Sequence, residues 1–167
     1  MRQFLADRVA SNYGLVTAGM RVGLAAAHQF HRRIGTRWMA RLAGMARRLS
    51  GNRLPAWNPY MPSGIRKPVL GTAAGTGTDK VVYFPSCINT AMGPALGDPD
   101  ADPLYQVVLR VIRRAGMETV SLKGRGGFCC GTPFESKGYN RQAARMAEQL
   151  EARLMEATEN GRWPVLC

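Results

Sequence analysis

The stretch GRGGFCCGTPFESKGY, residues 124–139, places two of the chain's four cysteines side by side. Adjacent residues on a regular strand point to opposite faces of a sheet, so Cys129 and Cys130 can face one ligand only where the backbone leaves regular geometry. Glycine tolerates such irregular backbone, and four glycines surround the pair: Gly124, Gly126, Gly127 and Gly131. We therefore expect an irregular loop in which both thiols turn toward a shared object.

Short strands alternate with helices on both sides of this loop. Apolar runs predict strands at 81–84, 117–122 and 164–166, and helical periodicity predicts helices at about 103–115 and 137–158. The expected buried stripe of the first helix is Leu104, Val107, Val108, Val111 and Ile112. That of the second is Tyr139, Ala143, Met146, Leu150 and Leu154. The order is β-α-β-α-β, which predicts an α/β domain with a parallel sheet.

All four cysteines follow predicted strands. Cys87 comes just after the first strand, Cys129 and Cys130 after the second, and Cys167 at the end of the third. In open parallel sheets, ligands bind outside the carboxyl ends of the strands, which meet at one edge. We therefore expect the four thiols to converge at that edge.

Thiolate ligands suit iron–sulfur clusters, zinc and cuprous copper. Both histidines, His28 and His31, lie in the N-terminal helices, so the expected site is all-sulfur and fits an iron–sulfur cluster or four-cysteine zinc. The glycines also allow backbone amides to approach the sulfurs, and such hydrogen bonds tune a cluster. The alternatives are a cofactor-free interaction module, with cysteines that are core residues or a vicinal disulfide, and a non-functional truncated fragment.

The N-terminal third is strongly basic. The net charge of the chain is +12, and residues 1–53 hold ten arginines and a single acid, Asp7. We predict two helices there, at 2–33 and 36–49, with a break at Gly35. The predicted domains are a basic helical arm (1–50), a Pro/Gly-rich linker (51–79) and a cysteine-rich domain (80–167). The arm is expected to dock on a protein partner or to lie on an anionic membrane surface, and no motif supports specific nucleic-acid binding.

Several side chains outside the cysteines receive structural interpretations. Ser136 is expected to cap the second helix at its N-terminus. Trp38 and Trp57 are expected to bury the helical arm, and the His28–His31 pair to lie packed or on the surface. Lys137 and Arg125 flank the cysteine loop and are interpreted as solvated charges. The sequence shows neither a signal peptide nor an apolar run of membrane-spanning length, which predicts a cytoplasmic chain, peripheral at most at the inner face of a membrane.

Three phrases in order, VVYFPSC, GFCCGTPFESKGY and PVLC, resemble the cysteine-rich CCG module of heterodisulfide reductase subunits and glycolate oxidase iron–sulfur subunits. The phrases YFPSC and CCGTPFESKG look most similar to the C-terminal part of FAD-linked, cytochrome-type D-lactate dehydrogenases. The arm and the AWNPYMP connector also resemble the segment that precedes this module in that enzyme, so the resemblance covers nearly the whole chain.

The resemblance implies an iron–sulfur electron-transfer module, part of a FAD-dependent 2-hydroxyacid dehydrogenase. It implies Cys87, Cys129, Cys130 and Cys167 as ligands of a [4Fe–4S] cluster or, in some relatives, zinc. Flavin-binding and ferredoxin-like portions are the implied partners, with FAD bound there, because this sequence has no Gly-rich dinucleotide fingerprint. The family motif continues to a further cysteine beyond the third strand, which implies a domain truncated at its C-terminus and not catalytic alone.

Overall fold

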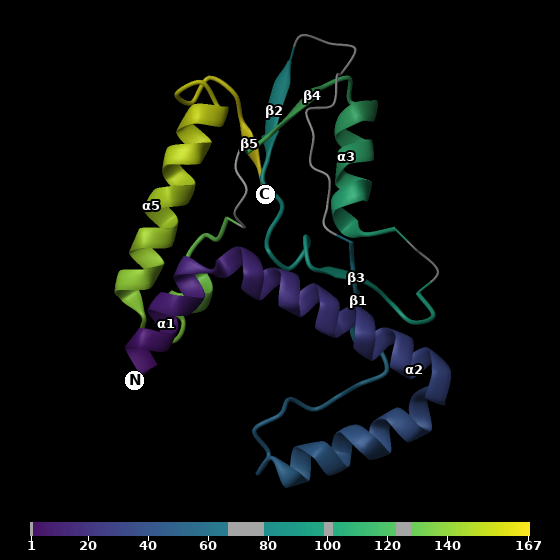
Figure 1. Ribbon diagram of the computed structural model, residues 1–167. Coiled ribbons are helices and arrows are strands. Elements are labelled where there is room, and N and C mark those ends of the chain that lie inside the picture. Colours follow the sequence, from purple (N-terminus) through teal and green to yellow (C-terminus); the bar gives the residue numbers. More distant parts are fainter. Residues whose placement is uncertain (1, 67–78, 99–101, 123–127) are drawn as a thin grey trace.

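A small parallel sheet lies between two long helices in the computed structural model, which describes residues 2–66, 79–98, 102–122 and 128–167 (Figure 1). Its three strands follow the order β4-β2-β5 and are parallel, with Val82 paired to Val120 on one side and to Val165 on the other. The strands are β2 (Lys80–Tyr83), β4 (Glu118–Ser121) and β5 (Val165–Leu166), and the helices are α3 (Leu104–Arg114), α4 (Thr132–Glu135) and α5 (Asn140–Ala157). The mixed α/β class is confirmed.

The central strand β2 supplies the core on both faces. Val81 and Tyr83 pack with Tyr105 and Ile112 of α3, and Val82 between them is fully buried. Because side chains alternate along a strand, Val82 points to the opposite face from its neighbours. A central strand covered on both sides is expected to read as a continuous apolar run, as this one does.

The buried face of α3 differs from the predicted stripe. Leu104 and Val111 are 55% and 61% exposed, whereas Tyr105 and Ile112 are buried. The helix is rotated so that Tyr105, Val108, Leu109 and Ile112, at spacings of three and four, face the sheet. The predicted helix end is confirmed: Ala115 caps α3, and Gly116 follows with a φ of +77°.

The second predicted helix is divided in two, and Ser136 is not its N-cap. A short helix, α4, precedes α5, and Ser136 follows the end of α4, where its hydroxyl donates to the carbonyl of Pro133 at 3.4 Å. Gly138, with a φ of +77°, separates the two helices. The predicted inner face of α5 is confirmed at its centre, where Ala143, Met146 and Leu150 are buried.

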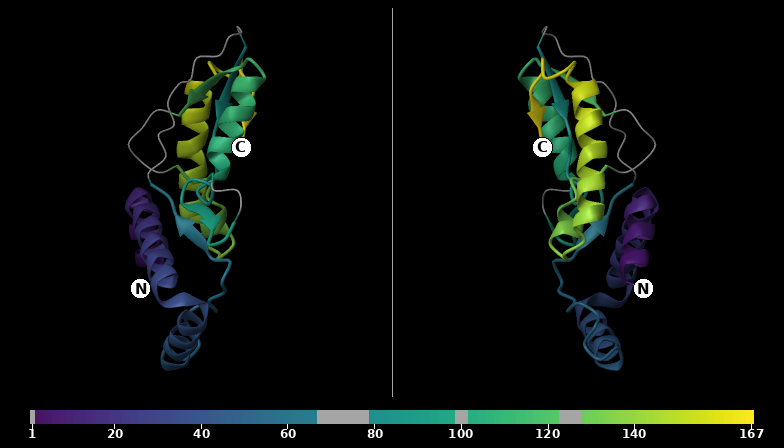
Figure 2. Two further views of the ribbon diagram at one scale, coloured as in Figure 1. Left: turned by 90° about the vertical axis from the view of Figure 1, so that its right-hand side faces the viewer. Right: turned by 90° about the vertical axis from the view of Figure 1, so that its left-hand side faces the viewer.

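The basic arm consists of α1 (Arg2–Ser11) and α2 (Tyr13–Leu49) and runs along one side of the molecule (Figures 1 and 2). Gly35 breaks α2 with φ 78° and ψ 166°, as predicted. We call residues 2–34 the inner arm and residues 36–49 the outer arm. The predicted division of the chain into three domains stays a prediction.

A second, antiparallel pair of strands joins the inner arm to the rest of the fold. It pairs β1 (Pro62–Gly64), within the predicted linker, with β3 (Met92–Ala95), where no strand was predicted. Gly64 lies against the backbone of α2, so that a β-carbon there would overlap the carbonyl oxygen of Arg21. Residues 67–78, another part of the predicted Pro/Gly-rich linker, lie outside the described residues.

The two tryptophans predicted to bury the arm differ. Trp38 is 60% exposed, so that prediction is wrong for Trp38. Trp57 is half-buried and meets the ring of His31 edge-on, with 4.9 Å between centroids. His31 is buried and shares a 3.0 Å hydrogen bond with Thr36, so it is a packed histidine.

Candidate metal centre

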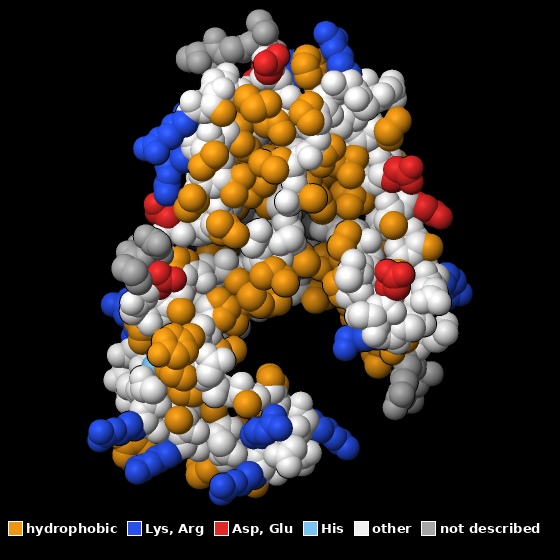
Figure 3. Space-filling view, turned by 180° about the vertical axis from the view of Figure 1, so that it is seen from behind, with side chains coloured by type: hydrophobic (Ala, Val, Ile, Leu, Met, Phe, Trp, Pro, Cys, Tyr) orange, Lys and Arg blue, Asp and Glu red, His pale blue; other side chains and the backbone are white. Residues whose placement is uncertain are grey.

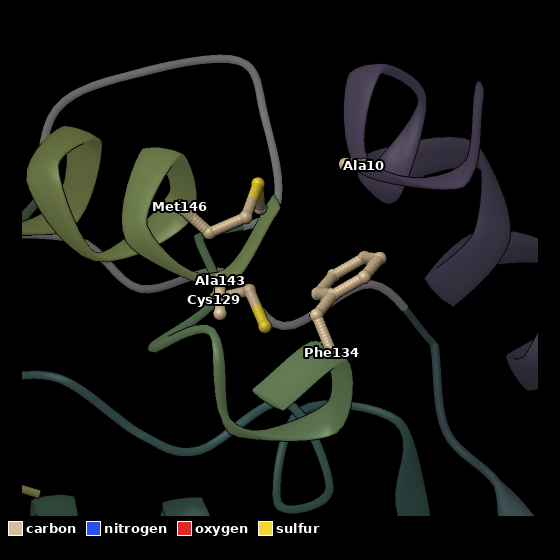
Figure 4. Close-up of a cluster of buried hydrophobic side chains, with 5 residues drawn as sticks. All are labelled: Ala10, Cys129, Phe134, Ala143 and Met146. Carbon is tan, nitrogen blue, oxygen red and sulfur yellow. The ribbon is translucent and has the colours of Figure 1, made fainter. Parts of the chain in front are cut away.

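The candidate site begins with Cys129, which is 2% exposed in a cluster shared by three helices. Figure 4 shows its sulfur directed toward the ring of Phe134 from α4, with Ala10 of α1 on the far side of that ring. Ala143 and Met146 of α5 complete the cluster. The inner arm therefore forms part of the apolar enclosure around this thiol.

Tyr13, the first residue of α2, connects two cysteines that lie far apart in the sequence. Tyr13 packs against the buried cluster that contains Cys129, and the thiols of Cys87 and Cys129 both act on its hydroxyl. Burial first of all, and then these two thiols, raise the pKa of Tyr13 well above its usual value, so the phenol keeps its proton. Cys87 also acts electrostatically on Cys129. The sulfurs after β2 and β4 thus both act on the same phenol group.

A backbone amide also reaches the Cys129 sulfur. The Gly131 N–H donates to Sγ at 3.5 Å, as the glycines around the pair led us to expect. Burial raises the pKa of the Cys129 thiol, while the hydrogen bonds from Tyr13 and Gly131 act in the opposite direction. Gly131 has a φ of +91°, and a β-carbon there would lie 2.5 Å from the carbonyl oxygen of Ala143. Glycine is thus the residue that fits this turn.

Cys130 has a different environment from its neighbour. It is exposed, and its thiol donates to the hydroxyl of Thr132 at 3.2 Å. The Thr132 hydroxyl is the main cause of a lowered pKa for the Cys130 thiol, and a hydrogen bond with Cys129 adds to it. Cys130 also borders an open, largely apolar groove of about 460 Å³ beside α5, lined among others by Leu150, Trp163 and Val165.

Cys167 lies at the same edge of the sheet but outside this group. It directly follows β5, where the Phe84 amide donates to the Leu166 carbonyl at 2.8 Å, and it is exposed. Within the part of the chain that the structure describes, Cys167 is not among the groups that shift the pKa of Cys129 or Cys130. The structure therefore connects three of the four predicted ligands: Cys87, Cys129 and Cys130.

The cysteines form a donor set that suits a soft metal. Among the described residues, no three His, Cys, Asp or Glu side chains lie close enough together to hold a single ion. Structural zinc requires all its sulfurs at about 2.3 Å from one ion, whereas a [4Fe–4S] cluster takes each cysteine on a different iron. The three thiols therefore do not form a preformed site for a single ion, and their all-sulfur donor set is one that iron–sulfur clusters also use.

Sequence reasoning missed two residues that hold the arm at the site. Tyr13 is one, and nothing in its helical context indicates a thiol partner. The other is Asp7, which pairs with Arg141 at 2.8 Å and accepts a 2.9 Å hydrogen bond from the Gln142 amide of α5. Its isolation as the single acid of residues 1–53 was the available signal. Lys137 is exposed, in keeping with a solvated charge, and Arg125 lies outside the described residues.

Residues 81–162 match the family model described as a cysteine-rich domain, CCG. This part of the chain is a CCG cysteine-rich domain. The match includes Cys87, Cys129 and Cys130 and ends before Cys167. No curated protein and no solved structure gave a significant match.

The domain's family points to metal or iron–sulfur binding. Within the described ranges, none of the helices has the length and apolar character that crossing a bilayer requires.

Proposed function

We propose that this CCG cysteine-rich domain binds a [4Fe–4S] cluster and serves as an electron-transfer module. Cys87, Cys129 and Cys130 are the proposed ligands, with Cys167 as the fourth. The observation that carries the proposal is that Cys87 and Cys129, which come from separate strand–loop segments, both act on Tyr13, which packs against the buried cluster of Cys129. When bound, such a cluster accepts and releases single electrons.

The chain's own residues have three tasks at this site. The thiolates hold the metal, and the lowered pKa of the Cys130 thiol favours the deprotonated form that a ligand requires. The Gly131 amide offers a hydrogen bond to the Cys129 sulfur, which offsets negative charge there. Phe134 and Met146 are buried beside Cys129 and keep water from that side.

The wider role proposed for the chain is part of a FAD-dependent 2-hydroxyacid dehydrogenase of the D-lactate type. The sequence phrases around the cysteines support it, and FAD is assigned to a separate flavin-binding portion. We expect the chain alone not to oxidise lactate, since its sequence carries no dinucleotide-binding fingerprint. Turnover of D-lactate by the purified chain with a dye acceptor would contradict this part of the proposal.

The test of the cofactor is anaerobic reconstitution of the full chain with iron and sulfide, followed by elemental analysis and visible absorption. The proposal predicts a brown protein with iron and acid-labile sulfide in equal amounts and reversible bleaching on reduction. A colourless chain that keeps one tightly bound zinc and no sulfide would instead identify a four-cysteine zinc module. A chain that retains no metal would leave a cofactor-free interaction module.

A further inference from the structure

We infer that Tyr13, from outside the matched family region, is a positioning residue of the metal centre whose hydroxyl donates a hydrogen bond to a cysteine sulfur there. The inference rests on the proposed function. It starts from the placement of Tyr13, which packs against the cluster that contains Cys129, with its ring 6.3 Å from that of Phe134. The hydroxyl at the end of this ring reaches both Cys87 and Cys129.

Contacts made by the inner arm before and after Tyr13 in the sequence fix the position of this residue. One helical segment earlier, Asp7 contacts Arg141 and Gln142 of α5, and Ala10 lies in the same buried cluster as Cys129. Further along the chain, Gly64 lies directly against the α2 backbone at Arg21. The phenol therefore approaches the sulfurs from a helix that is anchored before and after it.

A hydrogen bond to a cysteine sulfur stabilises the electron-rich, reduced form of a cluster and so raises its reduction potential. Tyr13→Phe removes the hydroxyl and keeps the ring that packs on Phe134. Tyr139→Phe is the matched control, because Tyr139 is also partly buried against the same cluster. The expected result is equal iron and sulfide content in all three proteins and a lower potential in Tyr13→Phe alone.

A second readout does not depend on the cluster. In the metal-free chain, infrared absorption of the cysteine S–H groups should shift in Tyr13→Phe and stay unchanged in Tyr139→Phe, since one variant loses a thiol partner. If the wild-type chain binds no iron, the proposed function fails, and the infrared comparison still decides the position of Tyr13. Identical S–H spectra in wild type and Tyr13→Phe, or identical potentials in loaded chains, would overturn the inference.

A separate observation concerns the outer arm, whose apolar side chains form an exposed stripe. Trp38, Leu42, Met45 and Leu49 follow one another at spacings of four, three and four, which places them on one face of the helix. Their exposed fractions are 60%, 38%, 54% and 88%. Four apolar side chains in a row are thus left in contact with solvent.

Positive charge borders this stripe. Arg37, Arg41 and Arg48 are exposed on the same helix, and Arg41 lies over the Trp38 ring at 5.4 Å from its centroid. No acidic residue occurs between Arg8 and Thr78 in the sequence. Figure 3 shows Lys and Arg side chains standing out around the lower part of the molecule, where the outer arm lies.

We propose that the outer arm docks on an anionic lipid surface. A helix with an apolar face that includes Trp, flanked by arginines, can lie in the membrane interface with that face among the acyl chains. Each arginine adds attraction to anionic headgroups. The absence of acidic residues from the outer arm gives the charge complementarity that selects an anionic over a neutral surface.

The test is co-sedimentation of the full chain with vesicles of phosphatidylcholine alone or of equal parts phosphatidylcholine and phosphatidylglycerol. We expect binding to the anionic vesicles that weakens with salt, and a roughly tenfold or greater loss of affinity in Trp38→Ser/Leu42→Ser, because two apolar anchors are removed. Val22→Ser is the control, since Val22 is 70% exposed on the inner arm, outside the stripe. No binding to anionic vesicles, or full binding by the double variant, would overturn the proposal and assign the stripe to a protein interface.

Discussion

The inner and outer arms are both basic, amphipathic helices, yet their contacts with the cysteine-rich domain differ. Both are rich in arginine and in apolar residues at helical spacing. The inner arm meets the cysteine-rich domain through Asp7, Ala10 and Tyr13, whereas the outer arm leaves Trp38 and Leu49 in solvent. A few specific contacts therefore decide which half of the arm belongs to the fold, and the amphipathic pattern alone does not.

The largest expected contrast compares two aromatic residues, one where the inner arm meets the domain and one on the outer arm. Phe134→Ala empties the space between Ala10, Tyr13 and Cys129, so we expect a loss of roughly 3–5 kcal/mol in the free energy of unfolding. Trp38→Ala removes an exposed side chain and should change stability by no more than about 0.5 kcal/mol. Urea unfolding measures both, and an equal loss in the two variants would remove the distinction.

Two glycines test the same difference between the inner and outer arms, because one contacts the inner-arm backbone and the other lies in open space. Gly64→Ala places a β-carbon against the Arg21 carbonyl of the inner arm, and we expect a loss of roughly 1–3 kcal/mol as the strand moves away. Gly44 lies in the outer arm with open space around it, so Gly44→Ala should stabilise the helix by about 0.5–1 kcal/mol. Thermal unfolding followed by circular dichroism should show midpoints displaced in opposite directions, and a shift of both in the same direction would contradict the account.

Asp7 makes two polar contacts, a partly buried hydrogen bond with Gln142 and an exposed ion pair with Arg141, and variants can measure each one. Asp7→Ala leaves the amide of Gln142, which is 2% exposed, without its acceptor, at an expected cost of about 1–3 kcal/mol. Asp7→Asn keeps an acceptor and should cost less. Arg141→Ala removes only the exposed ion pair and should cost about 0–1 kcal/mol. A loss in Arg141→Ala as large as that in Asp7→Ala would show that the charge pair is the anchor.

The smallest effect concerns the shielding of adjacent thiols by the inner arm. In the metal-free chain Cys130 should react first with iodoacetamide, because it is exposed and its pKa is lowered. Cys129 is buried with a raised pKa, so its thiolate forms at higher pH. The pH profile of Cys130 alkylation should therefore rise below the ordinary thiol range and that of Cys129 above it. Asp7→Ala should accelerate Cys129 and leave Cys130 unchanged, and mass spectrometry of the labelled peptides distinguishes the two.

The sequence predicted those features that depend on local patterns. Short apolar runs bounded by turn residues indicated the strands near Val82, Thr119 and Val165, and Gly35 marked the break in α2. Apolar spacing did not fix the rotation of α3, because Leu104 and Tyr105 both continue a helical stripe and only tertiary packing selects between them.

The sequence predicted that Cys87 lies near Cys129, but it did not predict which other residues contact these sulfurs. Strand–loop order placed Cys87 near Cys129, since the carboxyl ends of parallel strands meet at one edge. The Tyr13 contact joins residues more than seventy positions apart in the sequence, and no periodicity encodes it. The same holds for Gly64 against α2, where the close approach becomes visible only when both backbones are placed.

The central claim is that sulfurs from separate loops share one cluster. The most direct test measures iron and sulfide in the anaerobically reconstituted full chain for wild type, Cys87→Ser, Cys129→Ser and the outer-arm control Trp38→Ala. The account predicts that each cysteine variant loses most of the iron and the visible absorption, while Trp38→Ala keeps both. Full iron and sulfide content in Cys87→Ser would contradict it.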